Sequence, residues 1–217
     1  MPSSDVRAHL AALYAASDDP WDTCTSPYEQ GKFARTIACL PRPRYKSGLE
    51  VGCGAGTLSA LLARRCDKLI AMDCTDQAVR TALTRKDHTN VSFIVGEAPR
   101  DWPDHPPDLV ILSEVLYFMT DAESAGLALR LAHDCSAQCH VVLVNWLGDT
   151  DNIGGAAAAQ RLIAQLATAH HQLLAQNYAR FRIDVLARRG TTPTTVQAAL
   201  VRAPGIQMHG AGENWNA

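Results

Sequence analysis

The sequence predicts an α/β protein whose core is a Rossmann-like, mostly parallel sheet. From residue 47 onward, short apolar runs alternate with amphipathic stretches, which is the order of βαβ units with parallel strands. A glycine-rich segment at residues 52–56 lies where the first apolar run ends and the first amphipathic stretch begins, the position of a ligand-binding turn in such sheets. A chain of 217 residues fits one domain rather than two.

Residues 1–45 precede the sheet, and we expect them to form a helical cap. Within the cap, Asp18-Asp19-Pro20-Trp21 should separate two helices, because proline is well suited to a helix start. The Rossmann-like core is expected to cover residues 47–189, so that residues 1–189 make one domain.

The core elements follow from local pattern. Strands are expected at short apolar runs bounded by glycine or polar residues, which cover 47–52, 68–73, 91–96, 108–113 and 140–146. Helices are expected where apolar residues recur on one face, at 57–65, 75–86, 121–133 and 156–171.

Three further segments depart from this alternation of strands and helices. Residues 97–107 contain four prolines, which prevent a regular helix after the third strand. Residues 172–189 include the alternating Phe181, Ile183 and Val185, which predict a terminal hairpin at the sheet edge. Residues 190–217 are rich in Thr, Pro, Gly and Asn and are predicted to be a loose tail.

Charge and hydropathy argue against two classes of partner. The net charge is -2 and the sequence pI is about 6.4, so the chain lacks the dense positive field that binds phosphate backbones, and no nucleic-acid partner is expected. The first residues lack the continuous apolar core of a signal peptide, and no apolar run is long enough to span a bilayer. We therefore expect a cytoplasmic protein with no membrane partner.

The seven cysteines predict reduced thiols rather than a disulfide framework. Their number is odd, and several fall inside apolar runs, where they would pack as small hydrophobic residues. Cys135, Cys139 and His140 resemble part of a zinc set, but no second ligand pair follows at zinc spacing. No metal is expected.

The main chemical signal is residues 49–56, Leu-Glu-Val-Gly-Cys-Gly-Ala-Gly. Gly52, Gly54 and Gly56 would let the chain turn sharply and let a ligand approach the main chain around Cys53. Free amides at the start of the following helix favour a carboxylate or a phosphate. A glycine turn without any ligand is the alternative.

Two kinds of ligand compete for such a turn. In the dinucleotide fingerprint G-x-G-x-x-G the third glycine would come one residue later, where this chain has Thr57. The E-x-G-x-G-x-G pattern resembles instead the first motif of class I methyltransferases that use S-adenosylmethionine. The resemblance implies that S-adenosylmethionine is the cofactor, that S-adenosylhomocysteine is the product, and that Glu50 helps to hold the cofactor's amino end through water.

Two more segments fit a nucleoside. Asp73 ends the second strand, where a carboxylate accepts hydrogen bonds from ribose hydroxyls, and Cys74 follows it; a helix-capping role for Asp73 is the alternative. Glu97 and Ala98 end the third strand, where class I methyltransferases contact adenine with an acidic side chain and the next amide. Glu97 could equally be a solvated loop charge.

The fourth strand is followed by Ser113-Glu114-Val115-Leu116-Tyr117-Phe118. In class I methyltransferases this segment lines the channel between cofactor and acceptor, so Ser113 is assigned to the cofactor and Tyr117 to the acceptor. Glu114 is the candidate catalytic residue, because it could accept a proton from an incoming amine or orient that amine. A helix-capping role for Glu114, and a core role for Tyr117 and Phe118, are the alternatives.

A narrower family resemblance rests on four further segments. They are DDPW (18–21), SPYEQGKF (26–33), ARRCDKLIAMD (63–73) and DLVILSEVLYFM (108–119). Together with the glycine motif they resemble the NodS family of nodulation methyltransferases, over residues 17–147. The resemblance implies a seven-stranded, mostly parallel sheet with an antiparallel last strand.

The NodS resemblance also implies a chemistry. Members of that family N-methylate the free amino group of the terminal glucosamine in a partly deacetylated chitin oligosaccharide. Their N-terminal segment closes over the cofactor, which would bring Trp21, Tyr28 and Lys32 near its methionyl part, with Lys32 paired to the carboxylate. Tyr28 is then also a candidate contact for the acceptor.

The identity of the acceptor has several alternatives. Asn145 and Trp146 end the fifth strand and are candidate acceptor contacts, but residues 146–171 depart from the NodS pattern. An O- or carboxyl-methyltransferase for another small molecule is one alternative, and a non-catalytic nucleotide- or NAD-binding protein is another. A nucleic-acid methyltransferase is disfavoured by the acidic pI and by the lack of an Asn-Pro-Pro-Tyr run after the fourth strand.

Overall fold

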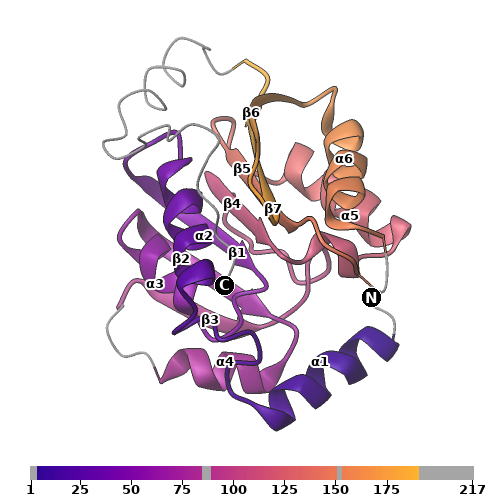
Figure 1. Ribbon diagram of the computed structural model, residues 1–217. Coiled ribbons are helices and arrows are strands. Elements are labelled where there is room, and N and C mark those ends of the chain that lie inside the picture. The colour runs from indigo at the N-terminus through magenta and orange to yellow at the C-terminus, as the bar shows by residue number, and fades with distance from the viewer. Residues whose placement is uncertain (1–3, 85–88, 151–152, 191–217) are drawn as a thin grey trace.

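The computed structural model describes residues 4–84, 89–150 and 153–190, and within them one sheet forms the core (Figure 1). The sheet has seven strands in the order β3-β2-β1-β4-β5-β7-β6. The strands are β1 (Tyr45–Val51), β2 (Cys66–Asp73), β3 (Val91–Val95), β4 (Leu109–Ser113), β5 (His140–Trp146), β6 (His170–Asn177) and β7 (Phe181–Arg188). Strands β1 to β5 pair in parallel, and β7 lies antiparallel between β5 and β6. The predicted fold class is confirmed.

Helices cover both faces of this sheet (Figure 1). They are α1 (Ser4–Ala16), α2 (Pro27–Ala38), α3 (Thr57–Ala63), α4 (Asp76–Leu83), α5 (Asp121–His133) and α6 (Gly155–Leu166), with a short 3-10 helix η1 (Leu116–Phe118). On one face, apolar residues of α5 and α6 pack on β1, β4 and β5. On the other face, apolar residues of α2 and α3 pack on β1, β2, β4, β5 and β7.

The connections place the carboxyl ends of the strands around one point. The chain runs outward from β1 to β2 and β3, and then crosses back to add β4 and β5 on the other side of β1. At this reversal Val51, the last residue of β1, pairs with Leu112, which precedes the last residue of β4. In open α/β sheets such a reversal is where ligands bind.

Capping residues fix where two helices begin. Ser26 caps α2 by accepting a hydrogen bond from the Glu29 amide, and proline occupies the first helical position. Thr120 and Glu123 form a reciprocal capping box at the start of α5, which begins at the predicted residue.

Helices α3 and α6 are shorter than predicted. Helix α3 ends at Ala63 rather than residue 65. Helix α4 ends at Leu83, and residues 85 and 86 of the predicted helix lie outside the described residues. Helix α6 ends at Leu166, and His170 and His171 belong to β6 instead of extending the helix. The alanine-rich composition favours a helix there, but both histidines pair with β7 in the antiparallel ladder.

Other expectations concern the loops, the tail and the cysteines. Residues 97–107 form no helix, as their prolines predict. The predicted loose tail lies outside the described residues from 191 onward. The seven cysteines all lie in the described residues and form no disulfide, and five of them are buried, in keeping with reduced thiols packed in the interior.

Candidate active site

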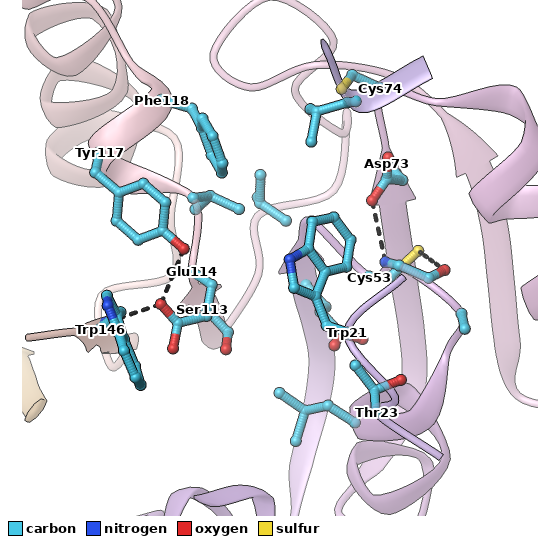
Figure 2. Close-up of a pocket in the computed structure, with 18 of the residues that line it drawn as sticks. Trp21, Thr23, Cys53, Asp73, Cys74, Ser113, Glu114, Tyr117, Phe118 and Trp146 are labelled. Atoms are coloured by element: carbon cyan, nitrogen blue, oxygen red, sulfur yellow. Dashed lines mark hydrogen bonds between the residues drawn. The ribbon is translucent and has the colours of Figure 1, made fainter. Parts of the chain in front are cut away.

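A cavity of about 900 Å³ opens at the carboxyl ends of β1, β2 and β4. Its walls come from the glycine turn after β1, the ends of β2 and β4, the segment after β4, and the N-terminal cap. Figure 2 shows Asp73 and Cys53 on one side of this space, Glu114, Tyr117 and Trp146 on the other, and the Trp21 ring between the two groups.

The glycine turn is shaped by main-chain hydrogen bonds and close packing. Gly52 and Cys53 both donate backbone hydrogen bonds to the carbonyl of Met72, at 2.8 and 2.9 Å, which holds the turn against β2. Gly52 has a φ of +78°, and a Cβ there would lie 2.3 Å from the side chain of Val115. Only glycine fits this position. Gly52 therefore lets the turn pack closely against the segment that follows β4.

Gly56 has a different role from the one predicted. It does not line the cavity, and a Cβ there would meet Ala82 at 3.1 Å and Phe93 at 3.3 Å. Gly56 therefore allows close packing of the start of α3 rather than direct contact with a ligand.

Glu50 lies at the base of the turn and is completely buried apart from its cavity face, with 1% of its surface exposed. Ser59 donates a 2.5 Å hydrogen bond to it, and among the described residues no cation pairs with its carboxylate. Burial raises the pKa of Glu50 to about 8, with a further increase from Asp73. Such a carboxylate suits a ligand that brings its own positive charge.

Asp73 ends β2 beside the same turn. One of its oxygens accepts a 3.0 Å hydrogen bond from the Gly54 amide, and the other accepts a 2.9 Å hydrogen bond from the Thr75 amide. Burial raises the pKa of Asp73 in spite of these two bonds, which lower it. The carboxylate is thus oriented by the backbone, and Asp73 and Cys74 both line the cavity.

Glu97 and Ala98 lie at the far end of the cavity, next to α1. The Glu97 carboxylate pairs with Arg7 of α1, with Arg7 Nη2 2.7 Å from Glu97 Oε1, although 90 residues separate the two in sequence. This ion pair joins the N-terminal helix to the end of β3. The cap therefore forms one wall of the cavity. Tyr14 of α1 lies in this wall, and its ring packs edge-on against Trp21.

Glu114 is the most constrained side chain of the opposite wall. Its φ of +58° is uncommon for a residue with a Cβ and is held by a 2.8 Å hydrogen bond from its amide to Val144. Its carboxylate accepts hydrogen bonds from Lys32 at 2.9 Å, from the Tyr117 hydroxyl at 3.1 Å and from the Trp146 amide at 2.8 Å (Figure 2). Strained backbone of this kind is concentrated at functional sites.

Lys32 also lines the cavity, but its ammonium group is paired within the chain. It lies 2.9 Å from Glu114 and 2.9 Å from Glu29, and only 4% of its side chain is exposed. The sequence prediction pairs Lys32 with the cofactor's carboxylate; in the structure its partners are these two glutamates.

Aromatic rings complete the wall around Glu114. Tyr28 and Trp146 meet edge to face with centroids 6.1 Å apart, and Tyr117 and Phe118 pack at 4.7 Å. The predicted contact Asn145 does not line the cavity and is completely buried. Successive residues of a strand point to opposite faces, so Trp146 faces the site whereas Asn145 lies under α6, close to Gly155.

Comparison with known proteins identifies the family. The model of the family described as Nodulation protein S (NodS) matches residues 4–136, more than half of the chain. The chain belongs to the NodS family. Nodulation protein S of Bradyrhizobium diazoefficiens is 32% identical over 130 residues, which cover 59% of this chain and 62% of that protein.

Two solved structures have a similar fold. The N-methyltransferase NodS of Bradyrhizobium japonicum, in complex with S-adenosylhomocysteine, superimposes with a TM-score of 0.71 at 21% identity, over 84% of this chain and 97% of that one. A candidate methyltransferase from Pseudomonas syringae has a TM-score of 0.66 at 31% identity, over 74% of this chain and 99% of that one. The fold is that of class I methyltransferases.

The structure adds site residues of this NodS-family chain that sequence reasoning missed. Asp19 accepts hydrogen bonds from the Thr23 amide and hydroxyl, and Thr23 contacts the Thr57 hydroxyl at 3.0 Å, which fixes the loop carrying Trp21 to the start of α3. Asp19 lies within the DDPW segment, so an Asx-type loop was the available signal. Glu29 gave no comparable signal, because its position three residues before Lys32 also fits an ordinary helix-surface pair.

Proposed function

We propose that this protein is an S-adenosylmethionine-dependent methyltransferase that N-methylates an amino group of a sugar-like acceptor. The observation that supports this most directly is that one cavity joins a nucleoside-type wall to a wall built for an amine. The first wall holds Glu50 and Asp73, and the second holds Glu114 with its aromatic surroundings.

The residues of the first wall fit the proposed cofactor. Glu50 is a buried carboxylate without a cationic partner among the described residues, which suits the ammonium of an amino acid. Asp73, oriented by two amides, suits a pair of ribose hydroxyls. Glu97, Ala98, Cys74 and Ser113 would complete the nucleoside wall, with Trp21 closing it from the cap. When bound, the cofactor supplies a methyl group that is already activated for transfer.

The chain's own contribution is then to hold the acceptor. A carboxylate such as Glu114, fixed by three donors, can accept hydrogen bonds from an amine and hold its lone pair in one direction. The indole of Trp146 and the rings of Tyr28 and Tyr117 offer flat apolar faces to the C–H surface of a sugar. Positioning of this kind can supply about 7–11 kcal/mol of a reaction barrier.

The acceptor class follows from family membership together with this wall. The relatives are named for nodulation, and the solved neighbour is named an N-methyltransferase, so the terminal amine of a partly deacetylated chitin oligosaccharide is the acceptor that we propose. None of the described helices is long and apolar enough to cross a membrane. We propose that the reaction takes place in the cytoplasm.

The test is direct. The purified chain is incubated with S-adenosylmethionine and a chitin oligosaccharide that carries a free terminal amine, and mass spectrometry should detect transfer of one methyl group. The fully N-acetylated oligosaccharide, which lacks the amine, should stay unmodified. Glu114→Gln should lower kcat/KM about 10- to 100-fold, because one hydrogen bond to a charged group is lost at the acceptor.

Asp67→Asn is the matched control, since it neutralises an exposed carboxylate that pairs with Arg44 and does not line the cavity. Methylation of hydroxylated acceptors but not of amines would contradict the proposed acceptor. Calorimetric binding of NAD without any binding of S-adenosylhomocysteine would contradict the methyltransferase proposal itself.

A further inference from the structure

Three charged side chains form a continuous group in the acceptor wall of the cavity. Lys32 Nζ lies between Glu29 and Glu114, at 2.9 Å from an oxygen of each, and all three residues line the cavity. The exposed fractions of the side chains are 4% for Lys32, 13% for Glu29 and 22% for Glu114. Two carboxylates share one ammonium, so the group carries one uncompensated negative charge beside the acceptor space.

The two glutamates differ in how many of their lone pairs are engaged. A carboxylate offers about four acceptor positions. Glu114 uses three of them for Lys32, Tyr117 and the Trp146 amide, and its main chain is held in a left-handed conformation. Glu114 therefore has one acceptor position left for a hydrogen of the acceptor amine.

Glu29 is freer to take a proton. Its carboxylate contacts Lys32 through both oxygens, and no other side-chain hydrogen bond to it is found in the described part of the chain. The charged groups that face it are Lys32 on its own helix, Glu114 after β4 and Asp19 in the cap loop, and the phenols of Tyr28 and Tyr117 lie near enough to interact with it. Burial raises the pKa of Glu29, as do Glu114 and Asp19, whereas Lys32 lowers it.

The proposed reaction requires a base near the acceptor. An amine on a sugar enters largely as an ammonium ion at neutral pH, and an ammonium ion has no lone pair with which to accept a methyl group. A base in the acceptor wall must therefore remove one proton before transfer, or the enzyme must wait for the rare neutral form.

We propose that Glu29 is the base that deprotonates the acceptor, and that Lys32 is a positioning residue that holds Glu29 and Glu114 in place. This inference rests on the proposed function. The N–H bond breaks, its electron pair stays on the amine nitrogen, and an O–H bond forms on Glu29. The neutral amine then forms a bond to the methyl carbon while the carbon–sulfur bond of the donor breaks and its electron pair stays on sulfur. The product is a methylated ammonium, and Glu29 returns its proton to solvent.

The experiment compares pH profiles of kcat for the wild-type protein and its variants, with the chitin oligosaccharide that carries a free terminal amine as the acceptor. In Glu29→Gln we expect kcat to fall about 10²-fold or more below the pKa of the acceptor's amine. This deficit should shrink as the pH rises above that pKa, because the acceptor then arrives already neutral. Binding of S-adenosylhomocysteine, measured by calorimetry, should be unchanged in Glu29→Gln.

Lys32 supplies a second, independent readout. In Lys32→Met both glutamates lose their counter-ion, so the acidic limb of the pH profile should move to higher pH. Lys32→Arg keeps the charge and should leave the limb in place. A purely structural role for Lys32 would lower activity without moving the limb.

The outcomes separate this inference from the proposed function. A wild-type protein that methylates amines, together with a Glu29→Gln variant that keeps full kcat or loses it equally at every pH, overturns the role of Glu29 alone. A wild-type protein that methylates no amine overturns the proposed function and this inference with it. Asp67→Asn serves again as the control carboxylate and should match the wild type.

Discussion

The hydroxyl of Ser59 donates a 2.5 Å hydrogen bond to Oε2 of Glu50 at the base of the glycine turn. This bond lowers the pKa of Glu50, but burial outweighs it and raises that pKa to about 8. At neutral pH the unliganded protein therefore holds Glu50 mainly in its protonated form. A ligand ammonium placed beside it would favour the ionised form.

The first prediction is that binding of S-adenosylhomocysteine near pH 7 releases a proton. Calorimetric titrations are carried out in buffers that differ in ionisation enthalpy. The observed binding enthalpy should change in proportion to the ionisation enthalpy of the buffer. Glu50→Gln should abolish this buffer dependence and weaken binding by about tenfold or more, since the charged partner is lost. Equal enthalpies in all buffers for the wild type would contradict the assignment.

Glu50 also predicts how stability depends on pH without ligand. Because its pKa in the folded state lies above the ordinary value of 4.5, its stabilising contribution is complete below that value and is lost as the pH rises to about 8. Glu50→Gln should therefore raise the free energy of unfolding, relative to the wild type, at about pH 9. Urea denaturation at about pH 5 and about pH 9 measures the difference, which should nearly vanish at the lower pH.

Two buried histidines predict that the free energy of unfolding falls as the solution becomes acidic. Burial lowers the pKa of His140 and of His170 from 6.5 to about 4, with smaller effects of Arg42 and Arg188 respectively. Their contribution is present above pH 6.5 and is lost as the pH falls through 4. His140→Gln should make the fall in unfolding free energy between these values shallower, as measured by urea denaturation.

The exposed His133 provides the control for this measurement. His133→Gln is the same substitution at an exposed position, and the change in slope caused by His140→Gln is measured relative to it. If His140→Gln left the slope of unfolding free energy against pH unaltered, protonation of His140 would not destabilise the folded state, contrary to the prediction.

Glycine substitutions should separate strained from unstrained positions. Gly52→Ala combines a φ of +78° with a Cβ 2.3 Å from Val115, so we expect a loss of about 2 kcal/mol or more in unfolding free energy. Gly154→Ala meets no atom within 4 Å at a φ of -59° and should cost only a few tenths of a kcal/mol. Thermal or urea unfolding of the two variants side by side is the test.

Trp21 should report closure of the cap. Its ring is 45% exposed and lies in the cavity wall against Tyr14. S-adenosylhomocysteine should shift the emission of the wild type to shorter wavelength, and Trp21→Phe should lose that shift while retaining binding. Trp21→Ala should weaken binding by about tenfold, because the buried ring surface is lost. A shift that persists in Trp21→Phe would assign it to another tryptophan.

Much of the fold could be predicted because its signals are local. Alternation of apolar runs and amphipathic stretches fixed the order of strands and helices, and α5 and β5 begin and end at the predicted residues. The end of α6 was not predictable in the same way. There, helix-favouring composition competes with strand pairing to β7, which lies further along the chain.

The site shows the same division. The glycine turn, Asp73 and Glu114 stand directly after strands, where their place in the sheet follows from sequence order. Asn145 and Trp146 were both assigned to the acceptor, although adjacent strand residues cannot face the same side. The link between Lys32 and Glu114 spans 82 residues and exists only because α2 packs beside the end of β4.

The ion pair between Arg7 and Glu97 attaches α1 to the end of β3 by a contact that salt can weaken. The Arg7 side chain is 38% exposed and the Glu97 side chain only 7%, so the pair is open to mobile ions at one end. We therefore expect the attachment of the N-terminal helix to the sheet to loosen as ionic strength rises.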